Sequence, residues 1–568
     1  MQSAGSPPRD SAPLFCAALV LGLAYLLTGV IGIWAAYDPV AAWLRFRLVV
    51  VGVTAMMIAA WLGRRHGERS LLLFSVACSF LAGTLGGYFM LTHDWAHAGE
   101  KMLLFDATGL WLQQHRPHIA VWKDLHPNVT AGALAVLLPL GAAAPVWAWR
   151  HSRRALVLVL GLALLPGAVA LLLCACRGAW LGLAAASVIV AHLERRPSRS
   201  PAGRRLSDAI VGAAVLATLV GWGLLVVAPQ QSVGWLAAVP GGTTALSRRA
   251  CWRDALVLLE DYPFTGAGLS GTKMVLASYV RLLQVPLLPH AHNLFLQIAA
   301  EQGLPGLVIF VGLLLLAMRS LWLARREPQA QPAFRIGFAV SLLTLIFHGL
   351  VDAGVYYMPT IPICFLPLGG AMALAPAMKW SSLRLALVAT IILSAVLLLL
   401  PAGRGELQAN LGTIAQTRAE LSVYRWPEWP VQDALRRSVA VNLMPAISHY
   451  DKALALDPDN VTANRRLGQI LLSLGDYDAA RRHLEAAYAR APLQQPIRQL
   501  LGETYAVSGD IAGAVRLWRS IDVSEGQLDL RRQWYEIIGD EQRAARIRAA
   551  TAATEQATGA SRPIPASP

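Results

Sequence analysis

The stretch RLLQVPLLPHAHNLFLQIAAEQGLPGLVIF, residues 281–310, leads from a polar segment into a long apolar run. The apolar run continues to residue 324, and about 20 such residues are enough to cross a bilayer. Polar groups at the start of a membrane span are costly, so His290, His292 and Asn293 need a reason to be there. The stretch predicts a membrane helix whose first residues form either a cap or a functional site.

The whole composition agrees with a polytopic membrane protein. Of the 568 residues, 55% are hydrophobic and 15% are charged, whereas soluble domains have about 25% charged residues. The first apolar run is expected to be a retained span, because no small-residue cleavage site follows it. We predict an all-α protein with about 11–12 transmembrane helices, the recognisable ones being 14–36, 45–62, 70–91, 128–149, 155–173, 177–193, 208–228, 294–324, 333–352, 360–378 and 382–401.

The formal charge of +15 is explained by membrane topology rather than by nucleic-acid binding. Basic clusters occupy alternate loops, at 63–69, 150–154, 194–205 and 319–327, and such loops stay cytoplasmic. The prediction is a cytoplasmic N-terminus, with loops 92–127 and 229–290 and everything after Pro401 on the outer, periplasmic side. Arg45 and Arg47 are exceptions, because this topology places them outside.

A different pattern begins after residue 401. Small residues recur with a period of about 34, which is the period of tetratricopeptide repeats. The matching positions are Ala446, Ala480 and Ala514; Tyr450, Leu484 and Trp518; Ala453 and Ala487; Pro458 and Pro492; Gly468 and Gly502; Gly475 and Gly509. We predict a transmembrane domain over 1–401, a linker over 402–426, a helical repeat domain over 427–550 and a disordered tail over 551–568. Such repeats form a concave surface for a protein or peptide.

Polar residues gather on the predicted outer side of the membrane domain. They are Arg177, Arg248, Arg249, Arg253, His290, His292, Asn293, His348 and Asp352. Arginine keeps its charge and grips phosphate oxygens with paired hydrogen bonds, while histidine can take a proton near neutral pH. Together they suit a transferase that acts on a lipid-linked diphosphate.

Each of these residues also has a structural explanation. Arg177 can extend to the lipid headgroups, the loop arginines can be solvated charges, and Asn293 can cap a helix. His348 and Asp352 are four residues apart and can form a hydrogen-bonded pair. A metal site is not predicted, because no Cys, Asp or Glu follows His290 and His292 closely in sequence. The six cysteines lie mainly in apolar runs and predict no disulfide framework.

Several ordered motifs between residues 125 and 370 resemble the O-antigen ligase and polymerase superfamily of bacterial membrane proteins. HNLFLQIAAEQGLPG from His292 is similar to the signature of that family, and RGAWL at 177–181 resembles its Arg-x3-Leu element. SRRACWRDALVLLEDYPFTGAGL, at 247–269, is similar to its outer-loop segment. HPNVTAGALAVLLPL from His126 and HGLVD at 348–352 resemble its spans.

The resemblance implies a GT-C-like helical membrane fold that works without metal or other cofactor. It implies transfer of a glycan from undecaprenyl diphosphate to an acceptor at the periplasmic face of the inner membrane. His292 would be the base and Arg177 and Arg248 would hold the diphosphate, with Arg249 and Arg253 as further candidates. His290, Asn293, His348 and Asp352 would support them, and Gly303 and Gly306 would allow close helix packing.

Three functions remain open from the sequence. A ligase would use lipid A–core, a protein or another carrier as the acceptor, whereas a polymerase would use a second lipid-linked glycan. A transporter or scaffold with repeats that recruit an envelope protein is the alternative outside enzymology. A transporter is expected to show interrupted helices in matching halves, and no such symmetry is seen.

Overall fold

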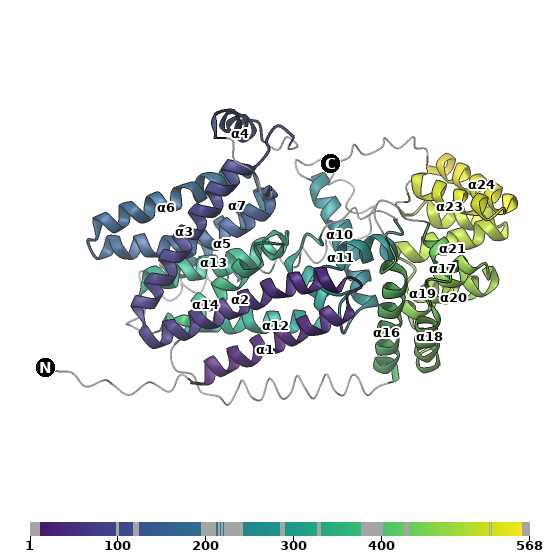
Figure 1. Cartoon of the computed structure of the whole chain (residues 1–568), viewed down its shortest axis with the longest axis horizontal. Coiled ribbons are helices and arrows are strands. Elements are labelled where there is room, and N and C mark those ends of the chain that lie inside the picture. The colour runs from purple at the N-terminus through teal and green to yellow at the C-terminus, as the bar shows by residue number, and fades with distance from the viewer. Residues whose placement is uncertain are drawn as a thin grey trace.

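The structure is a computed structural model that describes residues 12–97, 102–117, 124–194, 242–283, 290–326, 331–375, 401–424, 431–521, 523 and 525–558, and isolated positions between 209 and 220. The described residues form helices and no strand, as predicted. Figure 1 shows two regions along the long axis of the molecule, a bundle of long helices and a stack of shorter helix pairs. The predicted spans 208–228 and 382–401 lie essentially outside the described residues.

The long-helix bundle contains fourteen elements among the described residues. They are α1 (Ala12–Ala35), α2 (Pro39–His66), α3 (Glu68–Thr92), α4 (Leu103–His115), α5 (Pro127–Arg150), α6 (Arg154–Leu173), α7 (Arg177–Glu194), α10 (Gly242–Asp261), α11 (Thr272–Val275), η3 (Leu276–Val280), α12 (Leu294–Ala324), α13 (Pro332–Gly349), η4 (Gly354–Tyr356) and α14 (Ile361–Ala373). Seven of the described helices, namely α1, α2, α3, α5, α6, α12 and α13, are long and apolar enough to cross a membrane. The chain is a multi-pass membrane protein.

Two further predicted spans appear as different kinds of helix. α7 has 18 residues, but Arg177, His192 and Glu194 near its ends make it less apolar than the seven spans. The span predicted over 360–378 is the shorter apolar helix α14. Both pack inside the bundle, α7 against α13 and α14 against α2.

Helix α5 lies at the centre of the bundle, and its two prolines show how the interior satisfies its backbone. Pro145 has no N–H, so the carbonyl of Gly141 loses its usual helical donor. The hydroxyl of Ser79 donates to that carbonyl at 3.0 Å, and the hydroxyl of Ser75 donates to the carbonyl of Leu140 at 2.7 Å. The neighbouring helix α3 thus supplies a donor for the carbonyl that Pro145 leaves without one.

The C-terminal region is a stack of helix pairs. Its helices are α16 (Pro401–Leu421), α17 (Gln432–Arg437), α18 (Met444–Leu456), α19 (Val461–Leu474), α20 (Tyr477–Arg490), α21 (Gln495–Ser508), α22 (Ile511–Trp518), α23 (Glu525–Ile537) and α24 (Glu541–Thr558). The packed pairs are α16 with α18, α19 with α20, α21 with α22 and α23 with α24. The repeat glycines lie where the helices cross, since a Cβ on Gly468 would be 2.7 Å from Cγ of Leu484.

Two predicted boundaries are wrong. Residues 402–426 were expected to be a linker, but α16 fills most of this segment and is the first helix of the first repeat. A Cβ on Gly412 in α16 would lie 2.6 Å from Cε1 of Tyr450 in α18, which repeats the contact between Gly468 and Leu484. The disordered tail expected over 551–568 is wrong for residues 551–558, because α24 continues to Thr558; residues 559–568 lie outside the described residues.

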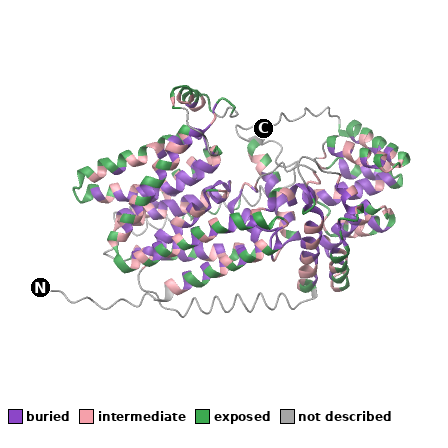
Figure 2. Ribbon diagram, in the orientation of Figure 1, coloured by how far each residue is buried: buried purple, intermediate pink, exposed green. Residues whose placement is uncertain are grey.

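The two regions share one hydrophobic core. Tyr262 and Tyr279, between α10 and α12 in the chain, belong to the same buried cluster as Ile414 of α16, Tyr450 of α18 and Leu467 of α19. Figure 2 shows mostly buried residues where α11, α16 and α19 meet. The repeats are therefore packed directly against the segment that leads to the candidate site.

Candidate functional site

The start of α12 places two of the predicted histidines. Asn293 is the N-cap, and its side-chain oxygen accepts a hydrogen bond of 2.9 Å from the N–H of Leu296. Its side-chain nitrogen donates to the carbonyl of Leu350 at 2.8 Å, which ties α12 to the segment that follows α13. Asn293 is fully buried, so its role is the structural cap considered in the sequence analysis.

The backbone of His292 is strained. Its φ is 48°, in the left-handed region that side chains other than glycine rarely adopt. The indole N–H of Trp252, on α10, donates to the carbonyl of His292 at 3.0 Å and helps to hold this conformation. Strained backbone of this kind is concentrated at functional sites, because the surroundings must keep it in place.

Asp352 is the centre of the site. It follows the end of α13, is fully buried, and accepts a hydrogen bond of 2.7 Å from the N–H of Gly354. Its Oδ2 lies 3.7 Å from Nδ1 of His292 and 3.4 Å from Nη2 of Arg248. A carboxylate thus joins an imidazole from α12 and a guanidinium from α10.

The polar groups around Asp352 favour its ionised form. Burial alone would raise the pKa of Asp352, but the imidazole of His292 and the nearby His348 and His290 hold that pKa well below its usual range. An ionised carboxylate beside Nδ1 of an imidazole favours the tautomer with a proton on Nδ1 and leaves Nε2 free to accept a proton. Distances near 3.7 Å are common at catalytic pairs before substrate binds.

His290 and His348 complete the histidine group. The rings of His290 and His292 meet edge to face with centroids 4.2 Å apart, and Tyr357 lies against His290 with centroids 5.8 Å apart. His348 is buried one turn before Asp352, and Nε2 of its ring has no hydrogen-bond partner among the described residues. A Cβ on Gly132 of α5 would be 2.9 Å from this ring, so α5 closes the site from that side.

The structure places the four predicted arginines differently relative to the site. Arg248 and Trp252 are one helical turn apart on α10, and both face the site, as their bonds to Asp352 and His292 show. Arg249 is buried on another side of α10, and burial and the charge of Arg253 lower its pKa. Of these arginines, Arg248 is placed at the site by its bond to Asp352.

Arg177 stands at the edge of the same site. It is the first residue of α7 and is exposed. A Cβ on its neighbour Gly178 would lie 3.9 Å from Nη1 of Arg248, which places the start of α7 next to the Arg248 side chain.

The site also contains groups that a metal ion could use. His290, His292 and Asp352 each offer a ligand atom, and these atoms all lie within 4.8 Å of one another. The sequence analysis predicted no metal because a third ligand was missing nearby in sequence, and folding supplies Asp352 from 60 residues further on. The guanidinium of Arg248 pairs with Oδ2 of Asp352, so a protein cation already balances the negative charge of this carboxylate.

The sequence analysis missed three neighbours of the site. Trp252 holds His292, Tyr357 packs on His290, and His126 lowers the pKa of His290 by its charge. Trp252 could have been found from its spacing, since residues four apart share a helix face. His126 precedes Pro127 at the start of α5, where its ring accepts from the N–H of Asn128 at 3.2 Å, a signal for a helix cap.

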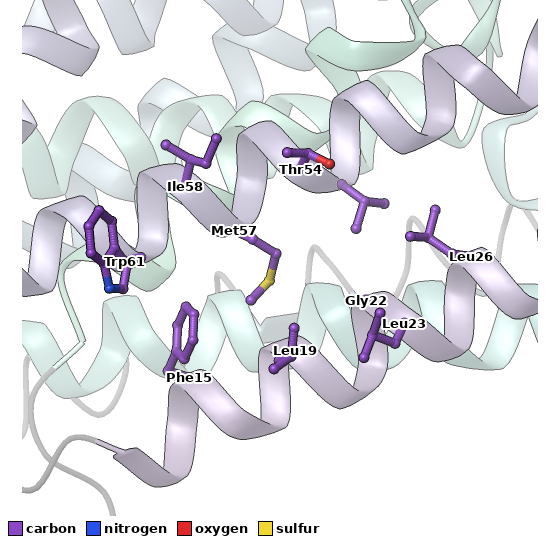
Figure 3. Close-up of a pocket in the computed structure, with 10 residues that line it drawn as sticks. Phe15, Leu19, Gly22, Leu23, Leu26, Thr54, Met57, Ile58 and Trp61 are labelled. Atoms are coloured by element: carbon purple, nitrogen blue, oxygen red, sulfur yellow. The ribbon is translucent and has the colours of Figure 1, made fainter.

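A separate apolar groove lies far from these residues. Figure 3 shows it between α1 and α2, with a volume of about 330 Å³ and a lining that includes Phe15, Leu19, Met57 and Trp61. Its lining is almost entirely apolar, and it lies toward the N-terminal end of α1, whereas Gly32 near the other end contacts Glu301. Such a surface suits lipid chains and contains no group for transfer chemistry.

Comparison with known proteins agrees with this division of the chain. Residues 162–311 match the O-antigen ligase family, and residues 442–495 and 471–522 match two tetratricopeptide-repeat families. No curated protein matches the chain. Arg177, Arg248 and His292 fall inside the first match, while His348 and Asp352 lie beyond it. The chain is therefore a multi-pass membrane protein with an O-antigen ligase domain and C-terminal tetratricopeptide repeats.

Proposed function

We propose that this protein transfers a glycan from a lipid-linked diphosphate, of the undecaprenyl type, to an acceptor hydroxyl. The convergence of His292, Arg248 and Asp352 from three separate segments is the observation that supports it. A base and a fixed cation at one point are what glycan transfer from a diphosphate needs. The O-antigen ligase match supports a membrane glycan ligase or polymerase.

His292 is the general base in this proposal. Asp352 orients its Nδ1, and Nε2 accepts the proton of the acceptor hydroxyl as that oxygen attacks the anomeric carbon of the glycan. The new bond joins the acceptor oxygen to the anomeric carbon, and the bond from that carbon to the phosphate oxygen breaks. The electron pair leaves with the lipid diphosphate, and the proton remains on His292.

Arg248 and Arg177 stabilise the leaving diphosphate. Nε of Arg248 is buried and has no hydrogen-bond partner among the described residues, and its Nη2 bond to Asp352 is long at 3.4 Å. A guanidinium that is held weakly in this way can turn two parallel N–H groups to phosphate oxygens. Arg249 and Arg253 contribute positive potential from other sides of α10.

Ligase and polymerase use the same site chemistry and differ in the acceptor. A ligase would use lipid A–core, a protein or another carrier, and a polymerase a second lipid-linked glycan. Mass spectrometry of glycoconjugates from cells with and without the gene separates them, because it identifies the molecule that fails to receive the glycan.

The test of the base is the variant His292→Ala, assayed for transfer from lipid-linked glycan in purified protein. A general base contributes about 10²–10⁴-fold, so transfer should fall at least about 100-fold while the protein still accumulates and folds. Asp352→Asn should also lower glycan transfer, because the amide no longer favours a proton on Nδ1 of His292. His151→Ala, at an exposed position between α5 and α6, is the matched control. Transfer retained in His292→Ala would defeat the proposal.

A further inference from the structure

The first helices of the repeats are buried on two sides. Eleven of the 14 residues of α19 are buried, compared with four of the 14 residues of its partner α20. α21 resembles α19, with ten buried residues of 14. A helix that only packs against its partner buries one apolar face, as α20 does. α19 and α21 therefore have a second buried face, on the side away from their partners.

The second buried face of α19 is polar and contacts the segment that follows α10. Arg465 and Arg466 are fully buried, and both pair with Asp261, the last residue of α10. Arg466 reaches Oδ2 of Asp261 at 2.8 Å, and Thr462 donates to Oδ1 at 3.0 Å. Burial would raise the pKa of Asp261, but these two arginines lower it, so the carboxylate stays ionised.

The contacts continue along the chain to residue 283, and we name residues 261–283 the groove segment. Arg465 donates to the carbonyl of Tyr279 at 2.8 Å, and the Arg466 guanidinium lies 3.8 Å from the centroid of the Tyr279 ring. The hydroxyl of Tyr279 donates to Glu420 of α16 at 2.9 Å. Gln527 of α23 donates to the carbonyl of Arg281 at 2.9 Å.

The groove segment contacts the first helices of all four repeat pairs, α16, α19, α21 and α23. These helices line one continuous side of the stack, the side on which repeats of this kind form a concave binding surface. Helix α17, which lies between α16 and α18 in the chain, covers more of the same side, because Asp433 accepts from Ser473 of α19 at 2.6 Å and pairs with Arg531 of α23. The chain itself thus fills the surface that such repeats offer to a peptide.

The groove segment is also fixed to the catalytic helix. The N–H of Ala267 donates to the carbonyl of Ala300 at 2.7 Å, and the N–H of Leu304 donates to the carbonyl of Pro263 at 2.8 Å. Both bonds join it to α12, the helix that begins beside His292. Since α10 ends at Asp261, the position of Arg248 on α10 depends on how the groove segment is held.

We propose that the groove segment is the built-in ligand of the tetratricopeptide repeats, and that Asp261, Arg465 and Arg466 are positioning residues that fix α10, and with it Arg248, relative to His292. The repeats then act on the transfer site from within the chain, and a protein partner would have to bind their outer side, formed by α18, α20, α22 and α24. The proposal about positioning rests on the transferase function, whereas occupation of the concave side does not.

The first experiment links the end of α10, directly before the groove segment, covalently to the repeats in the full-length protein. Glu260 and Gln494 hydrogen-bond to each other at the edge of the contact, so Glu260→Cys combined with Gln494→Cys can be bridged by a short bifunctional maleimide. The bridged protein should transfer glycan within about twofold of the unbridged double variant, because the concave side stays occupied during turnover. Loss of transfer on bridging would overturn the proposal, because it would show that the groove must open.

The second experiment weakens the contact and then repairs it. Asp261→Asn leaves two buried arginines without their carboxylate and should lower transfer about tenfold or more, since small displacements of a positioning group cost that much. The maleimide bridge between positions 260 and 494 should restore most of the loss, which a general folding defect would not allow. Asp459→Asn, in an exposed ion pair with Arg490, is the matched control and should have no effect. A failure of the bridge to restore transfer would overturn the positioning role.

Amide hydrogen exchange over residues 272–283 gives a readout that is independent of catalysis. Exchange in these residues should rise in Asp261→Asn and stay unchanged in Asp459→Asn. Unchanged exchange in Asp261→Asn would contradict the groove contact even if transfer fell. Absence of transfer in the parent protein, with the exchange result as expected, would instead contradict the proposed function alone.

Discussion

The groups around His290 determine the protonation state of its ring. Burial, together with the charges of His292 and His126, lowers its pKa to about 4 against the opposing charge of Asp352. His290 is therefore neutral at physiological pH and cannot donate a proton to the reaction there. It supports the site by packing between His292 and Tyr357.

This depressed pKa predicts a stability effect of known sign. The unfolded chain binds a proton at His290 near pH 6.5 while the folded protein resists it until about pH 4, so the unfolding free energy falls as pH drops through that window. The loss is at most about 3.5 kcal/mol, at about 1.4 kcal/mol per pKa unit. Thermal unfolding of His290→Gln should fall less between pH 7 and pH 4.5 than that of the parent, by a few degrees. Equal pH dependence would contradict the burial of His290, and exposed His151→Gln should follow the parent.

At the scale of single residues, the sequence named His292, Arg248 and Asp352 but could not show that they meet. They lie in three segments, and only the fold sets their separation. The choice among the adjacent arginines needed the exact rotation of α10, because each residue turns the helix by about 100°. The sequence left open whether Asn293 caps a helix or acts in the site. Its hydrogen bonds to Leu296 and Leu350 are those of a helix cap.

The helix α12, which begins beside His292, is bent. Gly303 has φ 69° and ψ −176°, so α12 is two helices joined at a kink. The first part, ahead of Gly303, is buried along most of its length, and the second is the membrane-spanning part. The groove segment approaches at the kink, where the N–H of Leu304 donates to Pro263.

A side chain at the kink should be poorly tolerated. A Cβ at residue 303 would lie 2.6 Å from the carbonyl carbon of Phe264, and the left-handed φ adds strain. Gly303→Ala should lower the free energy of unfolding by about 2–4 kcal/mol. Gly312→Ala in the same helix, where a Cβ meets only Leu21 at 3.7 Å, should be neutral or slightly stabilising. Thermal unfolding in detergent compares the two, and equal effects would mean that the close contact at residue 303 does not exist.

The repeats show where sequence periodicity stops being informative. The 34-residue period predicted α18 to α22 well, but counting one period back from Gly468 reaches Ala434, not a glycine. The matching glycine is Gly412, because α17 and its flanking residues are inserted between the two helices of the first pair. The dipeptide Leu-Gly at 411–412, 467–468 and 501–502 was the signal that could have found α16.

At the scale of the whole molecule, charge differs between the two ends of the bundle. The site and the repeats share one end, where α12 begins and α13 stops, while Arg64, Arg65 and Arg150 lie at the other end of α2 and α5. Arg45, an exception to the charge rule, is buried and bonds Glu301 at 2.7 Å and the carbonyl of Tyr356 at 2.8 Å. It is a structural interior charge, and the short basic loops at the other end of the bundle favour a non-cytoplasmic location for the site.

This orientation predicts which cysteine substitutions a membrane-impermeant maleimide will reach in cells whose outer membrane alone is permeable. Asp478→Cys, exposed on α20, should be labelled, because the repeats lie at the site end of the bundle and we expect that end outside the inner membrane. Ser152→Cys, exposed between α5 and α6 at the basic end, should be labelled only after the inner membrane is opened. The native cysteines are buried except Cys16, which is half-buried, so the parent protein gives the background. The reverse labelling pattern would place the repeats and the site in the cytoplasm, which would contradict the proposed location of the reaction. It would also mean that the basic ends of the helices face outward, against the charge rule.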